Sequence, residues 1–224
     1  MKSKAAIFDV DGTLVHTPKG YIYRVVGETL SALGRKGVRN EYIERFWFGM
    51  DRERIIAAYF HVDPEKFFAE FRRKDTGRAE VAMAYDDVDV LDELRDSGYR
   101  LGIVTGAPLE IFNRQVALIG REKFDEVVIA NPLHGRPAKP HPHALEECLD
   151  QMGVEKDNAV YIGNGEEDFL TAQRACVTPI LINRGEFDYS IVFSPEVKLP
   201  RHVLTSLYQL GSVLERIELE RRKG

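Results

Sequence analysis

Short apolar runs alternate with helical patterns over most of the chain from residue 86 onward. Each run is apolar on both faces, which is typical of buried strands in a parallel sheet. One more run of this kind stands near the start of the chain. The predicted strands are residues 5–8, 101–104, 126–130, 159–162 and 177–182, with a weaker sixth at 190–193. Helical spacing predicts helices at residues 88–94, 108–119, 144–152, 169–173 and 201–221.

This alternation predicts an α/β fold, a doubly wound and Rossmann-like parallel sheet with right-handed crossovers and helices on both faces. Residues 16–85 interrupt it with a helical region. Gly34 ends the first helix predicted there, Asn40 and Asp51 are candidate N-caps, and Asp63 before Pro64 indicates a fourth helix start. We therefore expect a core domain of residues 1–15 and 86–224, and an α-helical cap domain of residues 16–85 inserted after the first strand.

Composition narrows the class of protein. The chain has 224 residues, 44% of them hydrophobic, which is enough to bury a sizeable core. A net charge of −5 gives no argument for nucleic acid, and no apolar run approaches the roughly 20 residues of a membrane span. Cys148 and Cys176 lack CxxC spacing and fit free thiols in a reducing compartment. Without a signal-peptide pattern, we expect a soluble, cytoplasmic protein that binds neither nucleic acid nor membrane.

Polar side chains follow the predicted strands where each of them ends. Asp9 and Asp11 follow the first strand, and because side chains alternate along a strand, both point the same way. The carboxyl ends of parallel strands meet at one edge of the sheet, so we expect the residues found at the later strand ends to share a crevice with them. Those residues are Thr105, Lys139, Asn164 and Asp168.

These residue types together suit phosphoryl transfer. Oxygen donors without clustered Cys or His favour Mg²⁺ over zinc. The Thr105 hydroxyl, the Gly106 amide and the Lys139 ammonium suit a phosphate dianion. A carboxylate nucleophile, a second carboxylate for proton transfer, a metal ion and a lysine predict a reaction that passes through an aspartyl-phosphate.

Four stretches of the chain resemble, in order, the motifs of the haloacid dehalogenase-like hydrolases. They are Asp-Val-Asp-Gly-Thr at 9–13, Ile-Val-Thr-Gly at 103–106, Lys-Pro-His-Pro at 139–142 and Gly-Asn-Gly-Glu-Glu-Asp at 163–168. The chain is most similar to the capped phosphatase branch, the phosphoglycolate phosphatases and β-phosphoglucomutases. This resemblance covers nearly the whole chain and implies a doubly wound core with a helical cap inserted after the first motif.

The resemblance also implies a role for each site residue. Asp9 attacks phosphorus, and Asp11 protonates the leaving oxygen and then activates water. Thr105 and the Gly106 amide hold phosphate oxygens, and Lys139 offsets negative charge on the phosphoryl group and on Asp9. Mg²⁺ is the implied cofactor, and a small phosphorylated metabolite is the implied partner of a monomer or small homo-oligomer.

The implied Mg²⁺ ligands are Asp9, the Asp11 main-chain carbonyl, Asn164 and Asp168. Asn164 departs from the family, which usually has aspartate at this place. An amide oxygen can bind Mg²⁺ but adds no negative charge, so metal affinity and turnover depend on whether Asp168, Glu166 or Glu167 compensates. In the cap, residues 48–54 resemble a substrate-reading turn, and Arg52 is the predicted substrate-binding residue there.

The leading hypothesis is thus a Mg²⁺-dependent phosphatase, a phosphoric monoester hydrolase that acts on a small metabolite. A phosphosugar mutase of the same fold stays open, since the sequence does not show whether the cap retains a bisphosphate. A weakly active or inactive relative that binds phosphate or a partner also stays open, because of Asn164. Receiver-type phospho-switch domains place Asp, Thr and Lys at strand ends too, but they are smaller and carry no cap.

Overall fold

The computed structural model describes residues 3–195 and 197–222; residues 1–2, 196 and 223–224 of the predicted core domain lie outside this part. Within it, the chain forms a six-stranded sheet in the order β5-β4-β1-β6-β7-β8. Each strand is parallel to its neighbours, which confirms the predicted α/β class with a parallel sheet. The strands are β1 (Lys4–Phe8), β4 (Tyr99–Thr105), β5 (Glu126–Ile129), β6 (Ala159–Gly163), β7 (Thr178–Ile182) and β8 (His202–Leu204).

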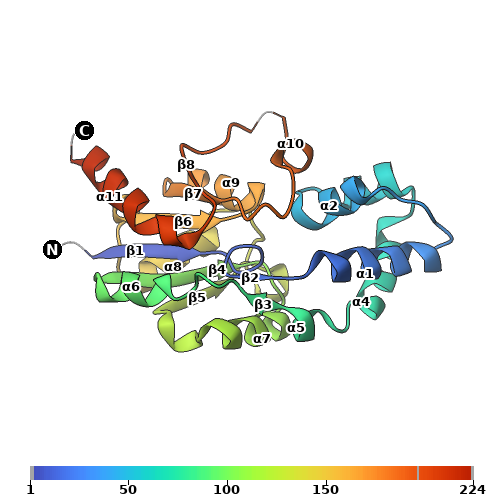
Figure 1. Cartoon of the computed structure of the whole chain (residues 1–224), viewed down its shortest axis with the longest axis horizontal. Coiled ribbons are helices and arrows are strands. Elements are labelled where there is room, and N and C mark those ends of the chain that lie inside the picture. Colours follow the sequence, from blue (N-terminus) through green and yellow to red (C-terminus); the bar gives the residue numbers. More distant parts are fainter. Residues whose placement is uncertain (1–2, 196, 223–224) are drawn as a thin grey trace. The chain divides into compact units, whose positions relative to one another are not determined.

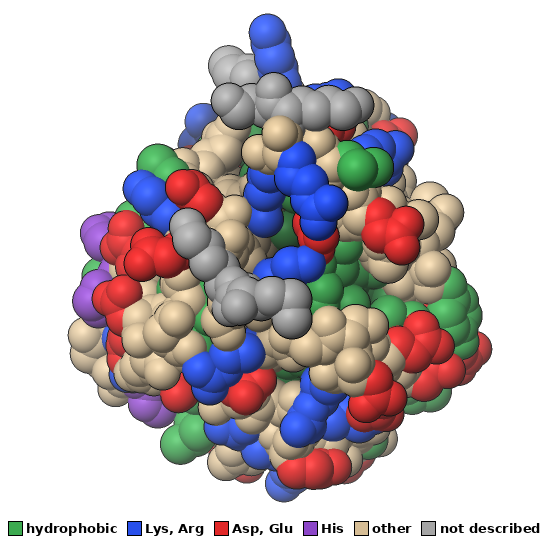
Figure 2. All heavy atoms as spheres, turned by 90° about the vertical axis from the view of Figure 1, so that its left-hand side faces the viewer, with side chains coloured by type: hydrophobic (Ala, Val, Ile, Leu, Met, Phe, Trp, Pro, Cys, Tyr) green, Lys and Arg blue, Asp and Glu red, His purple; other side chains and the backbone are tan. Residues whose placement is uncertain are grey.

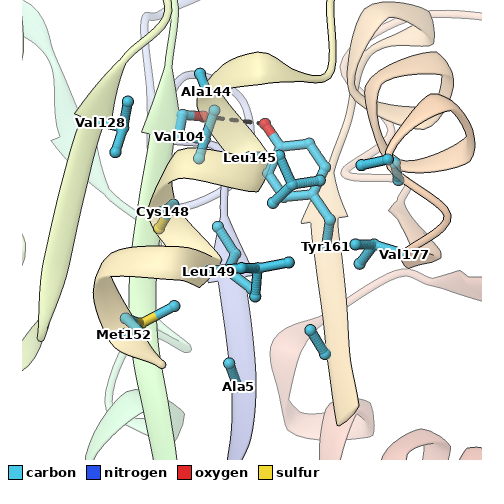
Figure 3. Close-up of a cluster of buried hydrophobic side chains, with 14 of the residues drawn as sticks. Ala5, Val104, Val128, Ala144, Leu145, Cys148, Leu149, Met152, Tyr161 and Val177 are labelled. Atoms are coloured by element: carbon cyan, nitrogen blue, oxygen red, sulfur yellow. Dashed lines mark hydrogen bonds between the residues drawn. The ribbon is translucent and has the colours of Figure 1, made fainter. Parts of the chain in front are cut away.

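Helices cover both faces of the sheet (Figure 1). α6 (Val90–Asp96) and α11 (Leu210–Arg221) lie on one side of the strands, and α8 (His143–Met152) lies on the other. Figure 3 shows how α8 packs along the strands and buries its apolar face, including Leu145 and Cys148, against them. α9 (Glu166–Arg174) contributes Ala172 to the same buried cluster. α7 (Leu109–Ile119) connects β4 to β5.

The central strands are in register at their carboxyl ends. Phe8, the last residue of β1, is paired with Ile103 of β4 and with Ile162 of β6. The Asp9 amide continues the ladder by donating to the Ile162 carbonyl oxygen at 2.9 Å. The loops that follow β1, β4 and β6 therefore start at nearly the same edge of the sheet, although β4 continues to Thr105 and β6 to Gly163.

The chain divides into two compact units. The core unit contains the described residues up to His16, Ala84–Gly185 and those from Leu199 onward; the helical unit contains Thr17–Met83 and the described part of 186–198. Short strands β2 (Val15–His16) and β3 (Met83–Ala84) pair where the chain leaves and re-enters the core unit. The helices of the helical unit are α1 (Lys19–Ala32), α2 (Asn40–Phe48), α3 (Arg52–Ile55) with a π-helical turn (Ile56–Phe60), α4 (Pro64–Lys74), α5 (Arg78–Val81) and α10 (Tyr189–Val192).

An aromatic cluster forms the interior of the helical unit. Phe46 of α2 packs against Phe60, Phe67 and Phe71, with ring centroids 5.0–5.8 Å apart. Aromatic rings bury a large apolar area each, which lets short helices share one core. The aromatic residues of this region therefore stabilise the unit rather than marking a ligand site.

Of the N-cap residues predicted in this unit, one caps its helix with its side chain and two do not. Asp63 does cap α4, because its side chain accepts from the Lys66 amide at 3.0 Å. Asn40 is instead the first residue of α2, and Asp51 precedes α3 in a left-handed conformation (φ 57°) without a capping hydrogen bond. The cap prediction at Asn40 was therefore wrong, whereas Asp51 does occupy the N-cap position of α3 but does not cap it with its side chain.

The weak sixth strand predicted at 190–193 is wrong, since α10 takes its place. Asp188 starts this helix by accepting from the Ser190 amide at 2.8 Å, an N-cap that outweighs the β-branched run after it. Phe187 stacks on Phe48 of α2 with centroids 4.4 Å apart. The described part of residues 186–198 thus belongs to the helical unit, whereas the predicted domain boundaries placed it in the core.

The helix predicted from residue 201 begins only at Leu210. Residues 202–204 form β8 instead, pairing with β7, and their burial alternates, with Val203 exposed between His202 and Leu204. Ser206 then opens a 3₁₀ turn (Leu207–Gln209). Here the two-residue period of an edge strand is too short to stand out against the longer helical pattern that follows.

Arg184, in the loop after β7, joins three parts of the core unit. Its guanidinium forms two hydrogen bonds with Asp87, at 2.6 and 3.0 Å, and one with the Thr13 carbonyl oxygen at 2.6 Å. Its charge also lies over the Tyr85 ring, 3.9 Å from the centroid. The loop after β1 is thereby tied to the chain that re-enters the core unit.

Figure 2 looks at the end of the core unit where β1 begins, opposite to the strand ends that carry the candidate site. Lys and Arg side chains are interspersed there with Asp and Glu. Among the described residues, no helix is long and apolar enough to cross a membrane.

Candidate active site

Lys139 lies between two carboxylates at the carboxyl ends of the strands. Its Nζ is 2.8 Å from Oδ1 of Asp9, which directly follows β1, and 2.6 Å from Oδ1 of Asp168 in the first turn of α9. The Lys139 side chain is 3% exposed, so this is a desolvated group of charges. A more distant carboxylate, that of Glu167, lies 3.9 Å away. The structure thus brings together three residues predicted from separate motifs.

Asp168 is held by hydrogen bonds on both of its carboxylate oxygens. Oδ2 accepts from the Gly165 amide at 3.0 Å, and Oδ1 is 3.0 Å from the Tyr161 hydroxyl as well as bonded to Lys139. A Cβ at Gly163 would lie 2.4 Å from Cγ of Asp168, so this strand end needs glycine. The carboxylate of Asp168 is therefore fixed in place by the turn between β6 and α9.

Tyr161 was not predicted as part of the site. Its ring is buried among the apolar residues between β6 and α8, and its hydroxyl reaches the Val104 carbonyl oxygen at 3.0 Å (Figure 3). Both neighbours of this hydroxyl, the Val104 oxygen and Asp168, are acceptors, so its single proton serves one of them at a time. A tyrosine in an otherwise apolar strand was the one sequence signal for this role.

The charges of this cluster do not balance. Burial, opposed by Lys139 and reinforced by the charge of Asp168, raises the pKa of Asp9 to about 8. Burial alone would lower the pKa of Lys139, but the carboxylates of Asp168 and Asp9 raise that pKa well above its ordinary value. Lysine therefore stays charged, and one cation shared between two carboxylates leaves Asp9 short of positive charge.

Asp11 lies two residues further on and is partly exposed. Its Oδ1 accepts a hydrogen bond from Nε2 of Gln115, at 2.7 Å. Gly12 follows in a left-handed conformation (φ 75°) and allows the turn that sends the chain back toward β2. Gln115 comes from α7 and was not predicted as part of the site.

Asn164 follows β6 and is 8% exposed. Its side chain lies against Gly12, where an added Cβ would stand 2.0 Å from Nδ2. The side-chain amide makes no hydrogen bond to any residue in the part of the chain that the structure describes. Its amide oxygen is therefore available to bind a metal ion.

The donor set at this edge fits Mg²⁺. A Mg²⁺ ion typically takes one or two carboxylates and fills its other positions with water and substrate phosphate. Asp9 offers a carboxylate that lacks positive charge, and Asn164 offers an unbonded amide oxygen. Within the described residues, no group of three or more Asp, Glu, His or Cys side chains is arranged to hold a metal, so an all-carboxylate cage is not the basis of this site.

Thr105 is the last residue of β4 and is almost completely buried. Its hydroxyl oxygen accepts from the Ala107 amide at 3.2 Å, which shapes the turn into α7. Gly106 in this turn has its carbonyl oxygen bonded to Asn131 at 3.3 Å. Thr105 thus has the local turn-forming role that its position before a helix suggests, and its contact with phosphate stays a prediction.

Arg52 is placed in the helical unit, at the first position of α3. It is exposed, and its guanidinium donates to the Trp47 carbonyl oxygen at 3.3 Å. Its predicted role in substrate binding stays a prediction.

The residues from 6 to 182 match the model of the haloacid dehalogenase-like hydrolase family. The chain belongs to this family. The predicted resemblance is thereby confirmed, and so is the predicted enzyme class at the level of a haloacid dehalogenase-like hydrolase.

Relatives of the chain carry phosphatase names. The chain is 25% identical over 207 residues to pyrophosphatase PpaX of Halalkalibacterium halodurans, covering 89% of this chain and 93% of the relative. It is 28% identical over 177 residues to a phosphoglycolate phosphatase of Xanthomonas campestris pv. campestris, covering 77% and 79%. A haloacid dehalogenase-like family hydrolase from Streptococcus pneumoniae shares the fold, with a TM-score of 0.75 at 20% identity over 94% of this chain and 98% of that one.

Proposed function

We propose that the protein is a Mg²⁺-dependent phosphatase that hydrolyses a small phosphomonoester through an aspartyl-phosphate on Asp9. The observation that carries the proposal is the buried Lys139 between Asp9 and Asp168. A buried cluster in which one carboxyl is short of positive charge does not stabilise the fold. The attraction between buried charges offsets the cost of removing them from water only when every charge is paired. The cluster suits a site that gains the missing positive charge when the metal ion binds and then accepts the phosphate group of the substrate.

Asp9 is the nucleophile in this mechanism. Lys139 bonds to Oδ1, and no described residue hydrogen-bonds to Oδ2. Oδ2 attacks phosphorus, and the bond between phosphorus and the leaving oxygen breaks as the new oxygen–phosphorus bond forms. Lys139 stays at Oδ1 and offsets the charge that the phosphoryl group brings next to Asp9.

Asp11 handles the protons. It gives a proton to the leaving oxygen in the first step, so that the alcohol departs neutral. In the second step it takes a proton from water, whose oxygen attacks phosphorus, and phosphate leaves with Asp9 restored. The Thr105 hydroxyl and the Gly106 amide hold phosphate oxygens at the end of β4 during both steps.

Asp9, the Asp11 carbonyl and Asn164 would hold Mg²⁺. When bound, the ion supplies the positive charge that stabilises both the ionised nucleophile and the phosphoryl oxygens. We assign Asp168 to orienting Lys139, because its two oxygens are already used by Lys139, Tyr161 and Gly165. This differs from the sequence-based expectation, in which Asp168 was a ligand.

The experiment that tests the proposal measures phosphate release from p-nitrophenyl phosphate by the wild-type protein, Asp9→Asn and a control, Asp92→Asn. Asp92 is an exposed aspartate of α6 outside the site. We expect Mg²⁺-dependent release by the wild type and the control, and a loss of at least about 10³-fold in Asp9→Asn. Activity that survives in Asp9→Asn would contradict the aspartyl-phosphate. A panel with pyrophosphate, phosphoglycolate and sugar phosphates then addresses the substrate.

Asn164 favours one alternative, a relative with weak metal binding and slow turnover that acts by holding phosphate or a partner. Asn164→Asp decides between the two functions. If the site is a weakened metal site, the added carboxylate tightens Mg²⁺ binding by about 10- to 100-fold in calorimetry and raises activity at low Mg²⁺. The alternative is excluded if the activity of the wild type is already saturated at low millimolar Mg²⁺ and the activity of Asn164→Asp is no higher.

A further inference from the structure

Gln115 is a polar residue on the buried face of α7. Its side chain is 0% exposed, and its neighbours on the same face of the helix, Phe112, Val116 and Ile119, are buried apolar residues. An apolar side chain of the same size would suit this position better, because a buried amide has to recover the hydrogen bonds that it loses with water. We therefore expect the Gln115 side chain to have a specific hydrogen-bond partner.

That partner is the carboxylate of Asp11. Nε2 of Gln115 donates to Oδ1 of Asp11 at 2.7 Å, across 104 positions of sequence. The other end of the amide, Oε1, is buried and bonds to no described residue. The bond from Nε2 to Asp11 thus leaves the oxygen of the buried amide without a partner, which a purely structural polar contact would not favour.

The way α7 is connected gives this contact a functional setting. α7 begins a few residues after Thr105, so the end of β4 supplies the predicted phosphate-binding hydroxyl and the helix that follows it supplies Gln115. Asp11 itself is only partly buried and lies directly before the left-handed turn at Gly12. A donor from a packed helix holds one oxygen of its carboxyl.

We propose that Gln115 is a positioning residue, which holds the carboxyl of Asp11 where it exchanges protons with the leaving oxygen and with water. The inference rests on the proposed function, in which Asp11 is the general acid and base. Gln115 acts through Asp11 and does not itself touch the reacting atoms.

The test uses leaving groups that differ in their need for a proton. Gln115→Met keeps the volume of the side chain and removes the donor, and Gln115→Leu serves as a second variant should the first fold poorly. Both are compared with Gln151→Leu, an exposed glutamine of α8. For each protein, kcat/KM is measured with 2,4-dinitrophenyl phosphate, p-nitrophenyl phosphate, phenyl phosphate and an alkyl phosphate, and folding is checked by circular dichroism and thermal unfolding.

We expect Gln115→Met to lower kcat/KM for the alkyl phosphate by about 30- to 100-fold, since misplacing a catalytic group by an ångström can have an effect of this size. For 2,4-dinitrophenyl phosphate, whose leaving group departs without a proton, we expect less than about 3-fold. Asp11→Asn should show the same graded pattern with larger losses. In the double variant, Gln115→Met should add little to Asp11→Asn, because the carboxyl that it positions is gone.

Two results would overturn the proposal. One is an equal loss with every leaving group, or none, in a folded Gln115 variant whose Asp11→Asn counterpart shows the graded pattern; Gln115 would then only fill space. The other is an additive double variant. Failure of the proposed function looks different, because then Asp9→Asn keeps its activity or Asp11→Asn lacks the graded pattern.

Discussion

The Lys139 cluster and the Arg184 cluster are both buried in the core unit, yet their charges are arranged in opposite ways. Arg184 faces a single carboxylate, Asp87, which also accepts from the Ser206 hydroxyl at 2.6 Å and the Leu207 amide at 2.8 Å. Lys139 faces two carboxylates, and Asp9 receives from it the one side-chain hydrogen bond that the described structure gives this carboxylate.

The pKa values of the two aspartates record this difference. Burial by itself would raise the pKa of Asp87, but its bonds from Arg184, Ser206 and Leu207 outweigh burial and hold that pKa below its ordinary value. Burial of Asp9 prevails over Lys139 and raises its pKa to about 8. A buried carboxylate that is fully paired stabilises the fold, whereas one left short of partners is available for chemistry.

Replacing Lys139 is the sharpest way to break the comparison. In Lys139→Met we expect kcat/KM for p-nitrophenyl phosphate to fall by about 10³-fold, because the cation that offsets charge at Asp9 is lost. Lys156→Met, at an exposed lysine, is the control. Circular dichroism shows whether the variant folds, and activity is compared only for folded protein. A loss below about 10-fold would mean that Lys139 is a structural group like Arg184.

Arg184→Met should act first on stability. It leaves the buried Asp87 carboxylate without its cation, so we expect the free energy of unfolding in urea to fall by about 3 kcal/mol. The activity of the folded fraction should fall less than in Lys139→Met, although the bond to Thr13 is also lost. Arg184→Met/Asp87→Leu should recover part of the stability. If the double variant is as unstable as the summed single changes, the two residues are not coupled.

The smallest expected effect is a change in how steeply the free energy of unfolding depends on pH. Folded Asp87 has a lowered pKa, so on acidification the unfolded chain, with an aspartate pKa of about 3.9, takes up its proton first. The stabilising contribution is therefore present above that pH and lost as the pH falls through the folded pKa. Measured from pH 7 to pH 3, the free energy of unfolding should drop less steeply in Asp87→Asn than in the wild type. Parallel curves would show that Asp87 is not held as a carboxylate.

The parallel sheet and the site residues at its strand ends followed from local patterns. Strands buried on both faces are continuous apolar runs, so a polar residue just after such a run stands out, as Asn164 does after β6. The carboxyl ends of neighbouring parallel strands lie at one edge of the sheet, and the loops that follow them meet there. That is why the pattern alone grouped Asp9, Lys139 and Asp168.

The contacts that escaped prediction depend on tertiary structure. Nothing local distinguishes Gln115 from a polar residue on an ordinary helix, because its partner is 104 positions away. Nor does a local pattern indicate that the Tyr161 hydroxyl lies 3.0 Å from Oδ1 of Asp168. The helix at residues 189–192 did carry a local signal in Asp188, but its place in the helical unit depends on the stacking of Phe187 on Phe48.

The return of the described part of residues 186–198 to the helical unit matters for anyone who would transplant that unit between relatives. An exchange of Thr17–Met83 alone would replace Phe48 and leave the Phe187 ring without the partner on which it stacks. Exposed rings of that kind promote aggregation. A chimaera that exchanges both segments together, with junctions near residues 16, 84, 185 and 199, keeps each aromatic contact within one parent.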